Sequence, residues 1–230
     1  MTQKVIKKAV QLANGADMPV MGLGTLFMKD AKVIENSILK AGYRNIDTAT
    51  IAMNEKEIGV GMKAALDSSE LKRDDLFVAA KLWHKQYFDP ETQLRKSLQA
   101  LQLDYVDIYY IHWPNNFFTD RPLPMHVLWQ RMEGLVDKGL CRGIGVSNFN
   151  TQLLADILTY ARHTPLVNQI NLNPYCVQGD LVKFLMDHEI MPVAYSPLGR
   201  IGAKMGPKTD DMRELPLIKD LAKKYGKSET

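Results

Sequence analysis

The chain has 230 residues and a formal net charge of +3, with 46% hydrophobic and 24% charged residues, as is ordinary for a soluble globular protein. So small a charge gives no reason to expect binding to nucleic acid or to an anionic membrane. Two cysteines, Cys141 and Cys176, are too few for a multi-disulfide framework or a zinc site, so we expect a reducing compartment.

The N-terminal residues lack the long apolar core of a signal peptide, and no apolar run reaches membrane-spanning length, so we expect a cytoplasmic protein.

Residues 9–20 predict a short hairpin, because Asn14-Gly15 is a two-residue turn signal between apolar stretches. Seven β-type runs follow, several of them continuously apolar, which is typical of parallel strands covered on both faces. They span residues 20–24, 43–47, 76–82, 105–112, 143–146, 166–172 and 191–195.

Between these runs, apolar residues recur at helical spacing, at positions 94, 98 and 101, at 154, 157 and 158, and at 181 and 185. Asp89 before Pro90, and Asn150 after the fifth run, are expected to cap helix N-termini. The glycines expected at helix C-termini are Gly42, Gly139 and Gly226. No linker divides residues 1–230, and alternating β and α units in one domain imply a parallel sheet.

Seven strands at this spacing favour a TIM-type (β/α)8 barrel over an open doubly wound sheet. The open sheet would want a G-x-G-x-x-G turn after a strand, whereas the segment from Gly143 to Asn148 lacks the third glycine and begins inside a strand. The eighth β/α unit of the barrel is expected to be missing, which leaves two unpaired sheet edges that invite association. Either the natural chain is longer, or a protein partner or a rearrangement covers the gap.

Polar residues end four of the predicted strands, where functional residues of such barrels lie. They are Asp47, Lys81, His112 and the pair Ser147-Asn148. Each has a plain structural interpretation by itself, as an ion pair or a satisfied polar group, but four at one barrel end together favour a functional site. A metal-dependent hydrolase would want clusters of histidines and carboxylates, and only His112 and Asp47 qualify.

Residues 41–59, AGYRNIDTATIAMNEKEIG, resemble the signature G-x-R-x-x-D-[ST]-A-x-x-Y-x-N-E-x-x-[VI]-G of the aldo-keto reductases. The matching positions are Gly42, Arg44, Asp47, Thr48, Ala49, Asn54, Glu55 and Gly59. Residues 18–25, 81–83, 111–114, 143–149, 167–171 and 194–199 also resemble family motifs and occur in the family order. The resemblance therefore extends over the whole chain.

The resemblance implies NADPH-dependent reduction of aldehydes and ketones to alcohols. Asp47, Lys81 and His112 match three members of the catalytic tetrad, and Ala52 stands where the family has its catalytic tyrosine. The residues implied to bind NADP(H) are Gly24, Thr25, Asp47, Ser147, Asn148, Gln169, Tyr195, Ser196 and Leu198. Those implied to line the substrate pocket are Leu26, Trp83 and Trp113.

In the family, the tyrosine donates a proton to the alkoxide, the lysine lowers the pKa of that phenol, and the histidine orients the carbonyl. Ala52 cannot ionise, and losing general acid catalysis typically costs about 10²–10⁴-fold. His112 is an alternative proton donor, since the pKa of histidine lies near neutrality. A deliberate change, a natural pseudoenzyme and a divergent active member would each explain Ala52.

Other departures concern the substrate and the cofactor. Leu26 stands where many members carry a tryptophan, and the C-terminal part that grips the adenosine 2′-phosphate in the family is not found. Arg200 and Lys204 could meet phosphate, although solvation at the surface is the expected role, and Phe117 and Phe118 extend an apolar pocket wall. Two functions follow as hypotheses: an impaired reductase, or an inactive reductase fold that serves in an assembly.

Overall fold

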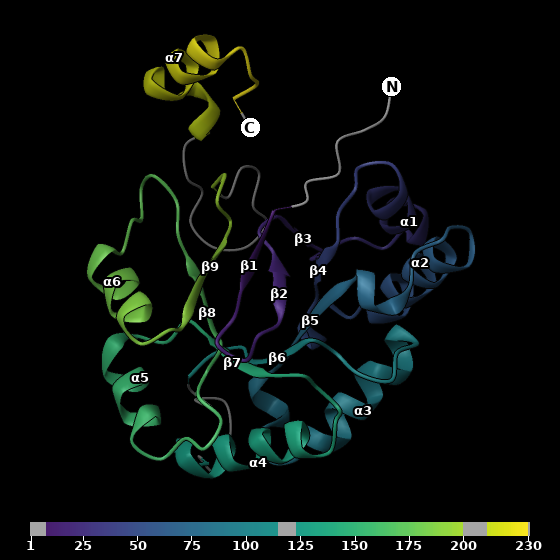
Figure 1. Cartoon of the computed structure of the whole chain (residues 1–230), viewed down its shortest axis with the longest axis vertical. Helices are drawn as coiled ribbons and strands as arrows, with labels where there is room; N and C mark the ends of the chain where they lie inside the picture. Colours follow the sequence, from purple (N-terminus) through teal and green to yellow (C-terminus); the bar gives the residue numbers. More distant parts are fainter. Residues whose placement is uncertain (1–7, 115–122, 200–210, 230) are drawn as a thin grey trace.

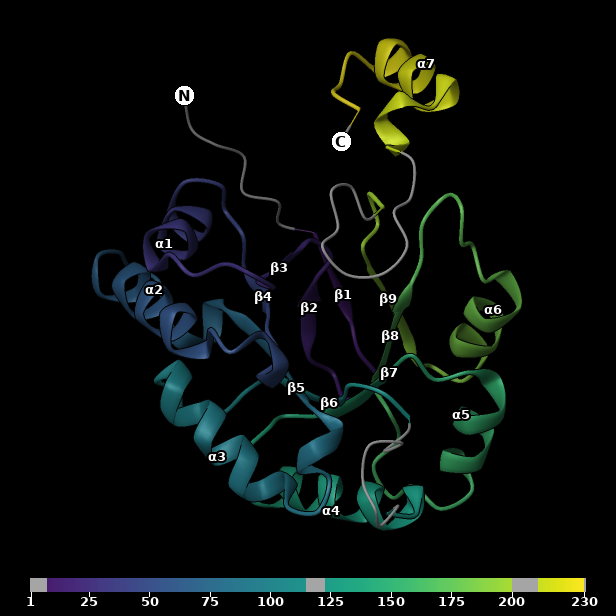
Figure 2. The same ribbon diagram turned by 180° about the vertical axis from the view of Figure 1, so that it is seen from behind.

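The computed structural model describes residues 8–114, 123–199 and 211–229. Seven parallel strands form one sheet in the order β3-β4-β5-β6-β7-β8-β9, so strands that are neighbours in the sheet are also consecutive along the chain. The strands are β3 (Gly22–Gly24), β4 (Asn45–Asp47), β5 (Phe77–Leu82), β6 (Ile108–Ile111), β7 (Ile144–Ser147), β8 (Val167–Asn171) and β9 (Met191–Tyr195). Helices α1 to α6 surround the curved sheet (Figures 1 and 2).

The predicted fold class is confirmed: the sheet is that of a (β/α)8 barrel with seven of its strands. Within the described residues, β3 and β9 are not paired with each other, so the barrel wall has an unsealed seam between them. All seven predicted strands are present, with ends that move by up to three residues. The run at residues 105–112 is the most shortened, because its continuous pairing with β5 is limited to Ile108–Ile111, of which Tyr109–Ile111 also pair with β7.

The helices are α1 (Ala31–Leu39), α2 (Glu55–Asp67), α3 (Pro90–Leu101), α4 (Met125–Asp137), α5 (Thr151–Leu158), α6 (Gly179–Asp187) and α7 (Pro216–Tyr225). Two predicted caps are confirmed: the Asp89 carboxylate accepts a hydrogen bond from Thr92 N (3.0 Å), and the Asn150 side chain accepts one from Leu153 N (3.0 Å). These bonds satisfy amide groups that the first turn of a helix leaves without partners. The three predicted C-terminal glycines all have a positive φ.

The strands are apolar on both faces because they separate two cores. In β6, Tyr109 and Ile111 pack outward against the helices, whereas Ile108 and Tyr110 point into the barrel. Each side chain of such a strand is therefore buried whichever way it faces, which explains the continuous apolar pattern.

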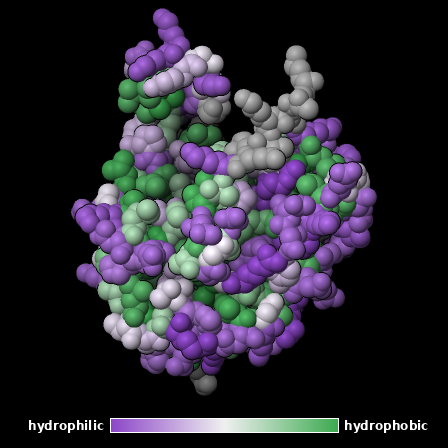
Figure 3. All heavy atoms as spheres, viewed as in Figure 1, coloured by the Kyte–Doolittle hydropathy of each residue, from purple (hydrophilic) through white to green (hydrophobic). Residues whose placement is uncertain are grey.

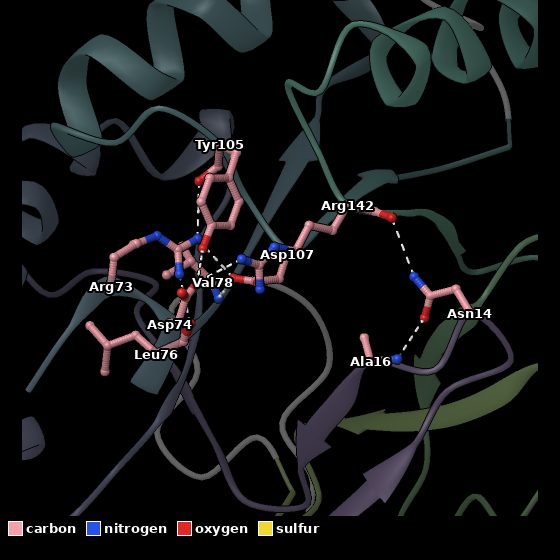
Figure 4. Close-up of polar contacts among 9 residues, drawn as sticks. All are labelled: Asn14, Ala16, Arg73, Asp74, Leu76, Val78, Tyr105, Asp107 and Arg142. Atoms are coloured by element: carbon pink, nitrogen blue, oxygen red, sulfur yellow. Dashed lines mark hydrogen bonds and ion pairs between the residues drawn. The ribbon is translucent and has the colours of Figure 1, made fainter.

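A hairpin of β1 (Ala9–Gln11) and β2 (Asp17–Pro19) closes the amino-terminal end of the barrel, where Leu12 and Met18 join the inner core. The hairpin is confirmed, but the predicted two-residue turn is wrong. The loop is longer, because Leu12 N donates to Ala16 O at 2.9 Å and leaves residues 13–15 between them. Asn14 Oδ1 accepts from Ala16 N (3.1 Å), and Asn14 Nδ2 donates to Arg142 O (3.2 Å). Gly15 N also donates to Leu12 O at 2.8 Å, so Asn14 lies within a turn and in addition attaches the hairpin to the barrel (Figure 4).

A charged network at the same end holds β5, β6 and β7 together (Figure 4). The Tyr105 ring lies between the guanidinium groups of Arg73 and Arg142, at 4.2 and 4.3 Å from its centroid. The buried Asp107 carboxylate accepts hydrogen bonds from Arg73 Nη2 and Val78 N, both at 2.8 Å. Because its charge is paired and hydrogen-bonded, we assign this network a structural role.

Hydrophilic and hydrophobic residues are interspersed on the face of the molecule that Figure 3 shows. In the described ranges, no helix is long and apolar enough to cross a membrane.

Candidate active site

Polar side chains meet at the carboxyl end of the sheet, as the sequence predicts. Asp47 is the last residue of β4, Lys81 is the penultimate residue of β5, and His112 directly follows β6. Ser147 ends β7, and Asn148 follows it. These four strands are neighbours in the sheet, so their carboxyl ends present the five side chains to one mouth of the barrel.

Asp47 and Lys81 form an ion pair inside this mouth. Lys81 Nζ donates to Asp47 Oδ1 and, at 3.3 Å, to Thr48 O, and the Lys81 side chain is only 4% exposed. The other carboxylate oxygen, Asp47 Oδ2, accepts from Gln169 Nε2 at 2.8 Å. This last bond spans the barrel interior, since β4 and β8 are not neighbours. The pair is thus oriented from two sides, which keeps its buried charges compensated.

Two threonines fix the backbone around this pair. Thr25 donates to Asp47 O through its amide nitrogen (3.0 Å) and its hydroxyl (2.9 Å), which ties the end of β3 to the end of β4. The Thr50 hydroxyl donates to Lys81 O at 3.0 Å. The sequence pointed to Thr25 only through the family resemblance and missed Thr50, because no local pattern marks a bond between residues 31 positions apart.

His112 is held as a neutral imidazole. Burial, followed by the positive charges of Lys81 and His84, lowers the pKa of His112 to about 3. Its ring lies edge-on to Trp83, with centroids 5.2 Å apart, and its Nδ1 atom is buried without a hydrogen-bond partner among the described residues. This low pKa argues against His112 as the alternative proton donor at neutral pH. A neutral imidazole still donates one N–H hydrogen bond.

Amide and hydroxyl groups of β6 to β9 form a connected network beside His112. Asn148 Nδ2 donates to His112 O and to Ser147 Oγ, both at 3.0 Å, and Ser147 Oγ donates to Gln169 O at 2.8 Å. The Tyr195 hydroxyl donates to Asn148 Oδ1 at 2.9 Å. Asn148 has a φ of 64°, a left-handed conformation that is unusual outside glycine and that this network supports.

Ala52 ends the short 3₁₀ helix Thr50–Ala52 at the rim of the mouth and is half-buried. Asn54 anchors this segment, because its buried Nδ2 donates to Thr25 O (2.7 Å) and Met28 O (2.8 Å).

Tyr110 places a phenol near Lys81, because Lys81 Nζ lies 5.5 Å from the centroid of the Tyr110 ring. Burial and the charge of Asp47 raise the pKa of Tyr110 well above its usual value, so Tyr110 is no substitute acid.

A sequence model described as the aldo/keto reductase family matches residues 13–229. The chain belongs to this family. It is similar to an aldose reductase of Encephalitozoon cuniculi (strain GB-M1), with 40% identity over 96% of this chain and 78% of the relative. It is also similar to aldo-keto reductase family 1 member A1-A of Danio rerio (37% identity, 95% and 74%) and member A1 of Homo sapiens (37%, 95% and 74%).

Other residues that the aldo/keto reductase resemblance selects lie at the same mouth or at its rim. Leu26 is 57% exposed, Trp113 is 38% exposed, and Trp83 is half-buried against His112. Gly24 ends β3 and is exposed. Ser196 has a φ of 49° just after β9, and Leu198 is 47% exposed. Phe117, Phe118, Arg200 and Lys204 lie outside the described residues.

Two cavities at the opposite end of the barrel do not belong to this site. One of about 180 Å³ includes Asn14 and Arg142, and another of about 410 Å³ includes Leu12 and Met191. Both lie against the hairpin, away from Lys81 and His112. Among the described residues, no group of three His, Cys, Asp or Glu side chains is placed to hold a metal ion.

Proposed function

We propose that this chain binds NADP(H) at the carboxyl end of its barrel and reduces aldehydes or ketones to alcohols, at a rate limited by Ala52. The observation that carries the proposal is the buried Asp47–Lys81 pair beside a neutral His112. Membership of the aldo/keto reductase family supports it. A structural ion pair alone would not need the unpartnered imidazole nitrogen that lies next to it.

The side chains of the mouth fit a nicotinamide cofactor, which supplies a hydride when bound. In this proposal, Ser147, Asn148 and Gln169 hold the carboxamide, since they present hydroxyl and amide groups that both donate and accept. Tyr195 provides a ring for stacking. The remaining proposed contacts are Gly24, Thr25, Asp47, Ser196 and Leu198.

His112 and Lys81 act on the carbonyl oxygen. The neutral imidazole donates a hydrogen bond that orients the carbonyl, and the positive charge of Lys81 stabilises the negative charge that develops on the oxygen. Asp47 keeps Lys81 in place. Leu26, Trp83 and Trp113 form the apolar walls against which the rest of the substrate packs. Without a phenol at position 52, the proton comes from water, so turnover falls by about 10²–10⁴-fold.

Binding of NADPH, followed by its fluorescence, tests this proposal without requiring turnover. We expect saturable binding that weakens in Asn148→Ala, because this change removes one amide from the proposed carboxamide site. Gln152→Ala removes an exposed amide from α5 and serves as the control, with unchanged binding expected. Failure of the unmodified chain to bind NADPH would contradict the proposal.

A second candidate is a catalytically inactive member of an assembly. Two observations favour it: Ala52 removes the ionisable group, and the edges of β3 and β9 are unpaired with each other in the described part of the chain. A protein partner that covers this seam would then be required. This candidate predicts no saturable NADPH binding and a stable complex in solution, so a monomer that binds NADPH counts against it.

A further inference from the structure

His112 and Trp113 continue the backbone of β6 beyond its last residue, at the point where the neighbouring strand β5 ends. β5 ends at Leu82, whose carbonyl oxygen accepts from His112 N at 3.2 Å. The carbonyl oxygen of His112 accepts from Asn148 Nδ2 at 3.0 Å. Both backbone polar groups of His112 are therefore bonded, one to a strand and one to a side chain. Trp113 lies one residue further and needs partners from elsewhere.

Tyr87 supplies both partners. Its hydroxyl donates to Trp113 O and accepts from Trp113 N at 3.4 Å. Tyr87 follows the 3₁₀ helix His84–Gln86, is only 1% exposed and packs in the outer core. Burial raises the pKa of Tyr87, so the hydroxyl stays protonated and able to donate. The Tyr87 hydroxyl thus bonds both backbone polar groups of Trp113, which a neighbouring strand would pair inside the sheet.

We propose that Tyr87 is a positioning residue, whose hydroxyl fixes the backbone of Trp113 and thereby the direction of its indole at the substrate side of the mouth. The statement about substrate rests on the proposed function, whereas the statement about Trp113 does not. Tyr87 touches neither the proposed cofactor site nor the reacting atoms, so its effect passes through Trp113. His112 keeps its own two backbone bonds and is expected to move less.

Tyr109 offers a matched control. It is as buried as Tyr87, and its hydroxyl has no hydrogen-bond partner among the described residues. Tyr109→Phe and Tyr87→Phe therefore remove the same atom from the same core, but only Tyr87→Phe breaks hydrogen bonds to Trp113. A general loss of packing would appear in both variants.

Fluorine NMR of the chain labelled with fluorotryptophan tests the positioning directly. The three tryptophans give three signals, and Trp113→Phe identifies the one from Trp113. We expect Tyr87→Phe to shift or broaden the Trp113 signal and to leave that of the buried Trp129 in place, with neither change in Tyr109→Phe. An unmoved Trp113 signal in Tyr87→Phe, or the same change in Tyr109→Phe, would overturn the proposal.

Kinetics in an Ala52→Tyr background test the consequence for substrate. We expect Tyr87→Phe to raise KM for a large aromatic aldehyde by about threefold to tenfold, as the loss of a net hydrogen bond predicts, with little change in kcat. A small aliphatic aldehyde, which does not reach Trp113, should show unchanged KM. Equal effects on the two aldehydes would contradict positioning through Trp113.

Thermal melts of Tyr87→Phe and Tyr109→Phe, which both keep the ring and its packing, guard against a folding defect. If the Ala52→Tyr chain shows no turnover with either aldehyde, the proposed function fails and the fluorine signals alone decide the role of Tyr87.

Discussion

The neutral state of His112 makes the stability of the fold depend on pH in a way that can be calculated. The pKa of His112 is about 3 in the folded chain, against an ordinary value of 6.5. Between these values the unfolded chain binds a proton that the folded chain does not, so stability is lost as the pH falls below 6.5. At pH 5 this loss amounts to about 2 kcal/mol relative to pH 7.5.

Denaturant unfolding of the chain and of His112→Gln, at pH 7.5 and at pH 5, measures this contribution. Other groups titrate equally in both chains, so the difference between the two pH dependences isolates His112. We expect the unmodified chain to lose about 2 kcal/mol more than the variant. Equal losses in the two chains, or a His112 imidazole that titrates near 6.5 by NMR, would refute the argument that burial and Lys81 keep the ring neutral.

Further predictions concern stability. Asp47→Ala leaves the buried Lys81 charge uncompensated and should lower the free energy of unfolding by about 3–5 kcal/mol. The double variant Asp47→Ala with Lys81→Met removes both charges and should lose less stability. Equal losses of the two variants in chemical denaturation would contradict the buried pair. Gly59→Ala places a Cβ 2.4 Å from Ala100 O, between α2 and α3, and should cost about 1–3 kcal/mol. Gly134→Ala on α4 meets nothing within 4 Å and should stabilise by about 0.5–1 kcal/mol, so thermal melts that rank the two glycine variants in the opposite order would contradict the packing.

The sheet was predictable because its signal is local. Strands buried on both faces, as in Ile108–Ile111, are apolar throughout, and helices that cover them on one side repeat their leucines at helical spacing. The bond from Asn14 to Arg142 was not predictable, because the two residues are far apart in the sequence. A turn signal describes neighbouring residues and carries no information about such a distant partner.

The site was predictable in position but not in its bonding. Strand order places Asp47, Lys81 and His112 at one mouth, because consecutive parallel strands bring their carboxyl ends together. The bond from Gln169 to Asp47 crosses the barrel, and the state of His112 depends on how deeply its ring is buried. Tyr87 gave no signal in the sequence, since an isolated buried tyrosine is usually part of a core.

The rate of NADPH oxidation by Ala52→Tyr, compared with the unmodified chain, tests most directly whether this barrel is a reductase that lacks its phenol. Asp47 and Lys81 are already paired and His112 already neutral, so a tyrosine at position 52 completes the set of groups. We predict that kcat/KM for an aldehyde rises by about a hundredfold or more. An unchanged rate in a variant that folds and binds NADPH would contradict the proposed function.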